Sequence, residues 1–208
     1  MAVVLGGVYA HWDDAVKING SVSTGVFNLQ LSVEDCWDIE DQQHILDVGH
    51  VSAELRDEND GDDVFDGGIH DKIWVNITNM YPDYEAWIDI NLENVGTIPA
   101  EIAAGLASDV GEEDTYYFIE IYETNTNSMI YSWNGDGLGG GEEYINTTWG
   151  HMEGDRFVFN DMLVPEEVWY ITIHIGMISE PNPPEELMDQ EYHFELEITG
   201  TQAVPEMP

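Results

Sequence analysis

The chain has 208 residues, 43% hydrophobic and 11% aromatic, which is enough apolar material for a packed core and excludes wholesale disorder. Only 4 Lys and Arg stand against 43 Asp and Glu, which gives a formal net charge of -39 at pH 7. So few cations exclude binding to nucleic acid phosphates or anionic lipid headgroups, and so acidic a chain needs salt, divalent cations or low pH to stay compact.

The chain opens with an apolar segment, Ala2–Ala10, which resembles the apolar part of a secretory signal but has no positively charged region before it. It is too short to span a bilayer, which takes about 20 apolar residues, and no other segment approaches that length. An exposed apolar end is an aggregation hazard unless it is captured. We therefore expect it to pair as a strand, either within its own domain or in a neighbouring copy.

The rest of the chain alternates apolar and polar residues, the period of two that predicts β-strands. About ten short strands with few helical signals predict an all-β fold, a jelly-roll-like antiparallel β-sandwich. Residues 12–202 are predicted to form a single domain, preceded by the apolar strand 1–11 and followed by a short tail, 203–208. The segment Pro99–Leu106 fits either a short helix or a further strand. In chain order, strands are expected at Val26–Leu31, Ile45–Leu55, Lys72–Thr78, Ala86–Glu93, Tyr116–Tyr122, Met129–Trp133, Tyr144–Thr148, Phe157–Phe159, Trp169–Ile175 and Tyr192–Ile198.

In four of these strands the alternation also predicts which side chains enter the core. His174 and His193 fall on the opposite, outward faces. The rows expected inside are Ile73, Val75 and Ile77; Ala86, Ile88, Ile90 and Leu92; Trp169, Ile171, Ile173 and Ile175; and Tyr192, Phe194, Leu196 and Ile198.

No catalytic motif occurs in the sequence: it has no HExxH zinc motif, no phosphate-binding loop and no GxSxG nucleophile elbow. The seven histidines are scattered without metal-ligand spacing. Cys36 is the only cysteine, so no intramolecular disulfide forms, and we expect a packed, inert thiol. We therefore predict that the protein is not an enzyme.

A dense carboxylate loop runs from Asp57 to Gly68. Ca²⁺ takes six to eight oxygen ligands in flexible geometry, which such a loop supplies, although the EF-hand template does not fit. The alternative is a solvated acidic turn. The candidate calcium ligands are Asp57, Glu58, Asp60, Asp62, Asp63 and Asp66.

Three N-glycosylation sequons begin at Asn19, Asn76 and Asn146. Asn76 lies on the outward face of its predicted strand, which suits a glycan. Together the sequons favour a glycoprotein of the cell surface.

Three segments resemble the TasA/camelysin-type family of secreted fibre-forming proteins, which includes archaeal bundling-pilus subunits. Trp12–Leu29 has the order of the family's mature start: an aromatic residue, a polar link, a Thr-Gly pair and a strand. Asn79–Pro99 is similar to the family's "N-YPGY … N-GTIP" stretch. Ile198–Gln202 matches the family's last strand, which ends in "TQ". Glu54–Gly68 and Thr124–Glu167 match nothing in the family pattern.

The resemblance implies a secreted jelly-roll subunit of a biofilm-matrix or cell-adhesion filament, with no membrane span in the mature chain. The mature N-terminus of one subunit would insert as a donor strand into the next copy, giving a head-to-tail homopolymer that can bundle laterally. The donor residues would be Ala2, Val3, Val4, Leu5, Val8 and Tyr9. Two other hypotheses stay open: a secreted hydrolase, and a monomeric Ca²⁺-dependent surface adhesin or carbohydrate-binding module that uses Trp133 and Trp149.

Overall fold

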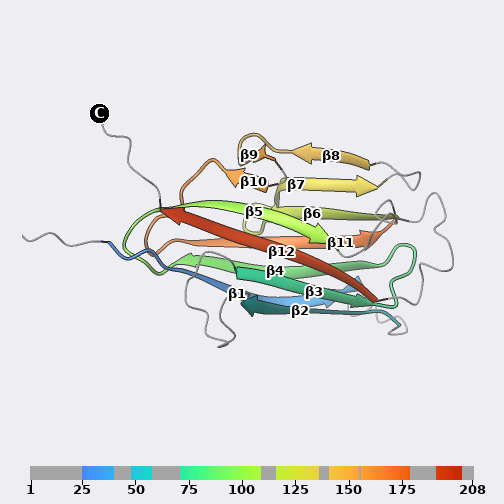
Figure 1. The fold of residues 1–208 in the computed structure, drawn as a ribbon. Helices are drawn as coiled ribbons and strands as arrows, with labels where there is room; N and C mark the ends of the chain where they lie inside the picture. Colours follow the sequence, from blue (N-terminus) through green and yellow to red (C-terminus); the bar gives the residue numbers. More distant parts are fainter. Residues whose placement is uncertain are drawn as a thin grey trace, which may run out of the picture.

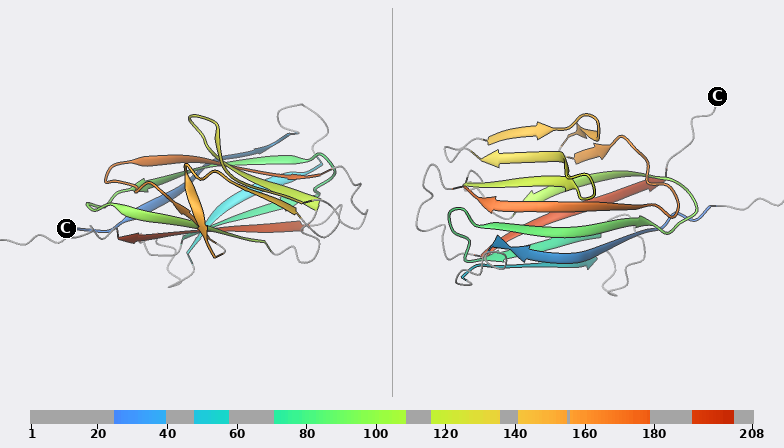
Figure 2. Two further views of the ribbon diagram at one scale, coloured as in Figure 1. Left: turned by 90° about the horizontal axis from the view of Figure 1, so that it is seen from above. Right: turned by 180° about the vertical axis from the view of Figure 1, so that it is seen from behind.

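Two antiparallel β-sheets pack face to face as a sandwich (Figures 1 and 2). The computed structural model describes residues 25–39, 48–57, 71–108, 116–135, 141–154, 156–178 and 191–202. The predicted all-β sandwich is confirmed. Among the described residues, no helix is long and apolar enough to cross a membrane.

Within the described residues each sheet has six strands, and every neighbouring pair is antiparallel. Sheet A consists, in spatial order, of β1 (Leu29–Asp38), β4 (Glu85–Asn94), β11 (Val168–Met177), β6 (Tyr117–Glu123), β7 (Ser128–Gly135) and β8 (Gly141–Ile145). Sheet B consists of β2 (His50–Asp57), β3 (Asp71–Thr78), β12 (Glu191–Gln202), β5 (Ala100–Ser108), β10 (Arg156–Phe159) and β9 (Gly150–Glu153).

Eight of these strands follow the jelly-roll order. The central strands are β3-β12-β5-β10 in sheet B and β4-β11-β6-β7 in sheet A. Strands β1 and β2 extend one side of the sandwich, and β8 and β9 extend the other. The predicted jelly-roll character therefore holds for the domain core.

The core lies between the sheets and is built from the alternating residues that the sequence predicts. All the predicted inward side chains of β3, β4 and β12 are buried, as are those of β11 from Ile171 onward. Trp169 is half-buried instead and packs against Phe159, with the ring centroids 5.0 Å apart. Each fully buried Ile, Leu or Phe stabilises the fold by about 1.5–3 kcal/mol relative to an exposed one.

The predicted strand ends differ from the observed ones where local patterns compete with long-range pairing. The segment Pro99–Leu106, left open between helix and strand, forms β5, because it pairs with β12 on one side and with β10 on the other. Strand β1 begins later than predicted and runs on to Asp38 through an irregularity between Val33 and Asp35. Strand β2 begins at His50. The predicted strand Tyr144–Thr148 ends at Ile145, where a turn leads into β9.

Candidate polymerisation interface

The predicted donor-strand residues, Ala2, Val3, Val4, Leu5, Val8 and Tyr9, lie outside the described residues. The structure describes the point where the chain enters the sandwich and the edges of both sheets. These two features show where two copies of the chain could contact each other.

The chain enters the sandwich at a neck, formed by Gly25–Asn28 and the β4–β5 turn. The Val26 amide donates to Thr97 Oγ1 at 2.7 Å, and the Thr97 amide donates back to the Val26 carbonyl at 2.7 Å. The Gly96 amide donates to the Asn28 carbonyl at 3.0 Å. The neck is therefore fixed by backbone pairing before β1 begins.

Two glycines allow the neck to close. A Cβ added at Gly25 would lie 2.1 Å from Ile98 Cγ2, and one at Gly96 would lie 2.5 Å from the Val26 carbonyl oxygen. Both distances are far shorter than van der Waals contact, so a side chain at either position would push the neck apart.

Asn94, at the end of β4, holds the turn beneath the neck. Its side chain is fully buried, and its Nδ2 donates to the carbonyls of Ile98 and Leu163, each at 2.8 Å. Its Oδ1 accepts from the Gly96 amide at 3.0 Å. Removing this side chain would leave several backbone groups without partners, which is costly in a buried site. The sequence analysis did not single out Asn94, although it is the Asn of the "N-GTIP" pattern.

The turn before β4 has a left-handed backbone at the position where the "YPGY" pattern has a glycine. Asp83 occupies that position here and has a positive φ of 65°. Left-handed backbone favours Gly and is tolerated by Asp and Asn. The next residue, Tyr84, is buried and donates its hydroxyl to Asp38 Oδ2 at 2.9 Å.

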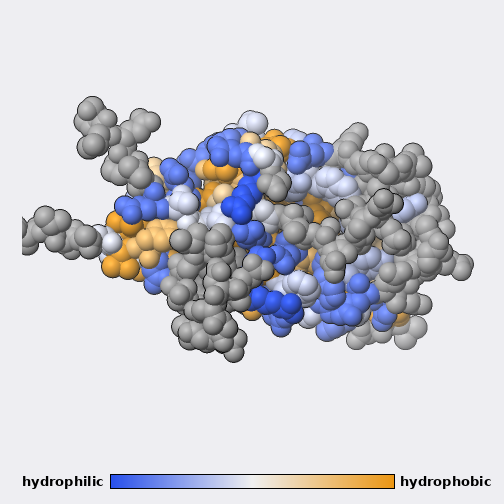
Figure 3. All heavy atoms as spheres, viewed as in Figure 1, coloured by the Kyte–Doolittle hydropathy of each residue, from blue (hydrophilic) through white to orange (hydrophobic). Residues whose placement is uncertain are grey.

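The end of the sandwich at the neck is apolar. Val26, Val95, Met162 and Val164 are between 42% and 59% exposed and lie in the neck or beside it. Figure 3 shows hydrophobic residues gathered at this end of the molecule. Next to it, Met162 and Val164 line a surface hollow of about 670 Å³ together with Trp149, Trp169 and Tyr170. Exposed apolar surface of this kind indicates an interaction site.

Within the described residues, the last three residues of β5 pair with a strand on one side only. On one side β12 pairs with the whole of β5, from Ala100 to Ser108. On the other side β10 reaches only as far as Gly105, so Leu106–Ser108 have no strand partner there among the described residues. Backbone groups at such an edge are a template for a strand from another chain.

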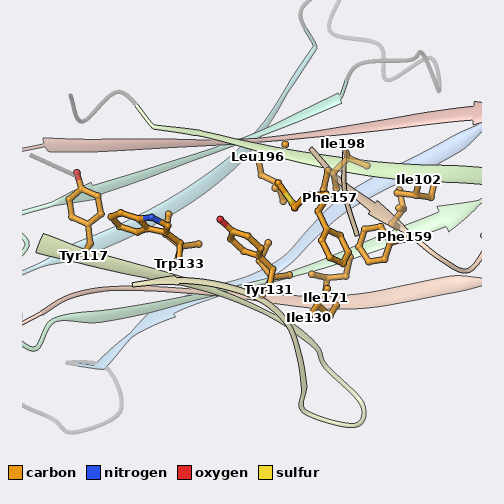
Figure 4. Close-up of a pocket in the computed structure, with 16 residues that line it drawn as sticks. Ile102, Tyr117, Ile130, Tyr131, Trp133, Phe157, Phe159, Ile171, Leu196 and Ile198 are labelled. Atoms are coloured by element: carbon orange, nitrogen blue, oxygen red, sulfur yellow. The ribbon is translucent and has the colours of Figure 1, made fainter. Parts of the chain in front are cut away.

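An apolar cavity of about 150 Å³ lies between the sheets beside this gap. Figure 4 shows Tyr117, Trp133 and Tyr131 in a row along one wall of the cavity, with Leu196 and Ile198 on the other wall. Burial raises the pKa of Tyr131 to about 12, and the neighbouring Glu143 carboxylate adds to the shift. An apolar cavity of this size is large enough to hold a side chain from another segment.

The neck and the gap lie toward opposite ends of the sandwich. Strand β5 begins beside the neck, where Ala100 pairs with Leu163, and runs to the far end, where the gap opens (Figure 1). Its nine residues cover about 30 Å at the usual rise of a strand. The neck and the gap are therefore separated by about the length of β5.

The predicted calcium loop connects β2 to β3. Asp57 pairs with Asp71 at the end of this hairpin, whereas Glu58, Asp60, Asp62, Asp63 and Asp66 lie outside the described residues. Within the described part of the chain, no group of three His, Cys, Asp or Glu side chains is arranged to hold a metal ion. The calcium site stays a prediction.

Two of the three sequon asparagines are described. Asn76 lies on the outer face of sheet B, as predicted, but it is half-buried between Ser52 and His193. Asn146 lies in the turn after β8, and its Nδ2, the atom that would carry a glycan, donates to the Met129 carbonyl at 2.9 Å. A glycan there would replace one of the two Nδ2 hydrogens, which leaves one N–H for this bond. Asn19 lies outside the described residues.

The predicted outward-facing His174 lies on the outer face of sheet A but is largely covered. Its ring stacks on Trp87 with centroids 4.7 Å apart, and its Nδ1 lies 3.0 Å from Glu120 Oε2. The hydrogen bond from His174 holds the pKa of Glu120 below its ordinary value; burial opposes the shift, and a second hydrogen bond, from Tyr122, adds to it.

The tryptophans considered for carbohydrate binding are both half-buried. Trp133 and Trp149 pack against the core, and Trp133 also lines the cavity. Cys36 is a free thiol packed against the core near the Val51 carbonyl, as the sequence predicts.

The chain matches no protein-family model, no curated protein and no solved structure. The resemblance to the TasA/camelysin-type family is neither supported nor excluded by these comparisons.

Proposed function

We propose that the protein is the structural subunit of an extracellular filament whose copies join head to tail by donor-strand complementation. The apolar N-terminal segment of one copy, Ala2–Ala10, adds a strand beside Leu106–Ser108 of the next. The observation that carries the proposal is this gap in sheet B, which begins next to Gly105, a residue that lines the apolar cavity, and lies at the other end of the sandwich from the neck.

The mode of contact follows from the edge itself. An added strand would form backbone hydrogen bonds with this edge, and its alternate side chains would enter the cavity. Val3 and Leu5 would point to the same side of such a strand, since they are two residues apart. A side chain of that kind suits the cavity lined by Tyr117 and Trp133.

The direction of the contact favours a filament over a closed ring. The donor leaves at the neck and the acceptor gap lies at the other end, so the contact joins two different surfaces. Head-to-tail contacts that do not close produce an open chain. The exposed Val26, Val95, Met162 and Val164 around the neck would then be covered by the next copy.

The proposal is tested with two substitutions of equal charge in the N-terminal region. Leu5→Asp places a carboxylate in the donor strand, whereas Ser23→Asp adds the same charge to the polar link before the neck. Negative-stain electron microscopy should show filaments for the wild type and Ser23→Asp and only single particles for Leu5→Asp. Circular dichroism should show the same strand content for all three proteins.

A complementation experiment checks the acceptor separately. A peptide of residues 1–10 added to the chain that lacks them should raise its melting temperature, because a ligand that binds only the folded state stabilises it. Filaments formed by Leu5→Asp, or a melting temperature that the peptide does not change, would contradict the donor-strand contact. Wild-type protein that stays monomeric, with and without Ca²⁺, would favour the surface-adhesin alternative.

A further inference from the structure

The surface hollow of about 670 Å³ lies along the edge of β11, beyond the end of β6. Strand β6 pairs with β11 from Met177 back to Ile171 and ends there at Glu123. The hollow continues along β11 from Ile171 to Val168, and the β10–β11 loop and the β8–β9 turn supply its other walls. Strand β11 lies between β4, which leads to the neck, and β6 (Figure 1), so Glu123 stands across β11 from the neck.

Aromatic rings line this hollow from separate parts of the chain. Trp169 and Tyr170 come from the start of β11, whereas Trp149 comes from the β8–β9 turn and Phe159 from the end of β10. Tyr170 is 41% exposed, and the two tryptophans are half-buried. Aromatic side chains in a concave site are typical of small-molecule pockets, whose volumes are about 300–1,000 Å³.

Hydrogen bonds hold the walls of the hollow in place. The Trp149 carbonyl accepts from the Asn160 amide at 2.8 Å, and the Trp149 amide donates to the Asn146 carbonyl at 2.9 Å. Glu167 Oε2 accepts from the Val164 amide at 2.9 Å, which fixes the β10–β11 loop. The hollow is therefore formed before any ligand enters it, and binding need not order these segments.

Every charged side chain that lines the hollow is a carboxylate. These are Glu123 at the end of β6, and Asp161 and Glu167 in the β10–β11 loop; no Lys, Arg or His is among the described lining residues. Glu123 accepts from the amides of Thr126 at 2.7 Å and Asn125 at 3.1 Å, and such bonds favour the ionised form. The hollow therefore combines ring surfaces with negative charge.

This combination selects an organic cation. The face of an aromatic ring attracts a positive charge, and the carboxylates attract it as well. The three described carboxylates are not arranged to hold a metal ion, which in any case makes no use of ring surfaces. The carboxylates repel an anion, and a neutral sugar could stack on the rings but would gain nothing from the charge. A cation that carries alkyl groups uses both features of the hollow.

We propose that the hollow binds a small organic cation of the ammonium class, with alkyl groups next to its charge. The rings of Trp149, Trp169 and Tyr170 contact the alkyl groups, and the three carboxylates supply the opposite charge. The net charge of -39 raises the concentration of such cations around the whole molecule. The site goes beyond the proposed filament, because a single sandwich contains all of its residues.

Isothermal titration calorimetry with choline tests the proposal on the full-length protein at fixed ionic strength. The matched probe is the neutral carbon isostere of choline, in which a tert-butyl group replaces the trimethylammonium group. We expect choline to bind at least about tenfold more tightly than the isostere. Equal affinities would show an apolar groove that does not recognise charge. Tighter binding of the neutral sugar maltotriose would assign the hollow to carbohydrate, and either result would overturn the proposal.

Substitutions that keep the net charge locate the site. Trp169→Leu removes a ring that lines the hollow, and the control Trp37→Leu makes the same change on β1, outside the hollow. The general attraction of cations to this acidic chain is the same in both variants. We expect Trp169→Leu to weaken choline binding about fivefold and Trp37→Leu to leave it unchanged. Equal affinities of the two variants for choline would overturn the proposal.

Exposed positions give a second set of variants, because Trp169 also packs on Phe159 and its loss can disturb the fold. Tyr170→Leu and Asp161→Asn should each weaken choline binding about threefold, with circular dichroism spectra like that of the wild type. Asp35→Asn is the matched control for charge, since Asp35 is exposed on β1. Equal weakening by Asp161→Asn and Asp35→Asn would show that net charge alone attracts choline, which would overturn the proposal.

The titrations are run on the wild type and on full-length Leu5→Asp, because the next copy in a filament would lie close to Met162 and Val164 at the rim of the hollow. Choline binding by either chain supports the site, and its absence from both overturns the proposal. Since the measurement does not require filaments, failure of the cation site is distinguishable from failure of the donor strand.

Discussion

The cavity beside the gap in sheet B allows a substitution that separates folding from assembly. Ala104 on β5 lines this cavity, and Ala103, next to it, faces outward. Empty cavities cost about 24 cal/mol for each Å³, so a void of about 150 Å³ corresponds to about 3–4 kcal/mol of lost stability. Ala104→Leu adds three carbon atoms to this space, which would contribute at most about 2.4 kcal/mol at about 0.8 kcal/mol for each buried CH₂.

Part of that gain is offset by the adjustment of neighbouring side chains. We therefore expect Ala104→Leu to raise the free energy of unfolding by about 1–2 kcal/mol, measured by urea denaturation of the unpolymerised protein. The same variant should fail to form filaments in electron micrographs, because the new side chain occupies the place of the donor residue. A protein that is more stable but does not assemble is the combination that the proposed contact predicts.

Ala103→Leu is the matched control, since it makes the same chemical change on the outer face of β5. It should leave filament formation intact. If Ala104→Leu forms filaments as the wild type does, the cavity is not the acceptor site. If Ala104→Leu lowers the free energy of unfolding, the cavity does not have room for the added side chain.

Two further predictions concern ions and pH. Millimolar Ca²⁺ should raise the melting temperature relative to EDTA if the Asp57–Gly68 loop binds calcium, and equal melting temperatures would rule out a stabilising site. The folded-state pKa of Glu120 lies below the ordinary value of 4.5, so the stability it contributes is fully present above about pH 4.5 and is lost as the pH falls through the lower, folded-state pKa. Glu120→Gln should therefore have a lower urea midpoint than the wild type at pH 7, and the difference between the two midpoints should shrink at pH 3. A difference of the same size at pH 3 would show that the ionised Glu120 carboxylate does not cause it.

Local alternation was sufficient to predict most of the fold. A residue pattern with a period of two fixes which side of a strand meets the core, and so the inner rows of β3, β4 and β12 follow from sequence alone. Where the composition of a segment suits more than one structure, its pairing with neighbouring strands decides which structure forms. Ala100–Ser108 is rich in helix-forming Ala, and its place between β12 and β10 decides that it is a strand.

The features that carry the functional proposals are produced by long-range register, which a single sequence does not reveal. The gap beside Leu106–Ser108 depends on where β10 begins. Asn94 had a sequence signal, the polar residue at the end of an apolar strand, but its role follows from the three backbone groups that converge on it.

The net charge of -39 sets the conditions that any self-association of this chain must meet. Strand addition at Leu106–Ser108 relies on backbone hydrogen bonds and apolar side chains, which do not depend on net charge. Salt should therefore favour the head-to-tail contact throughout, because it screens the repulsion between copies without weakening the bonds that form. Filaments that come apart as the salt concentration rises would therefore contradict strand addition as the head-to-tail contact.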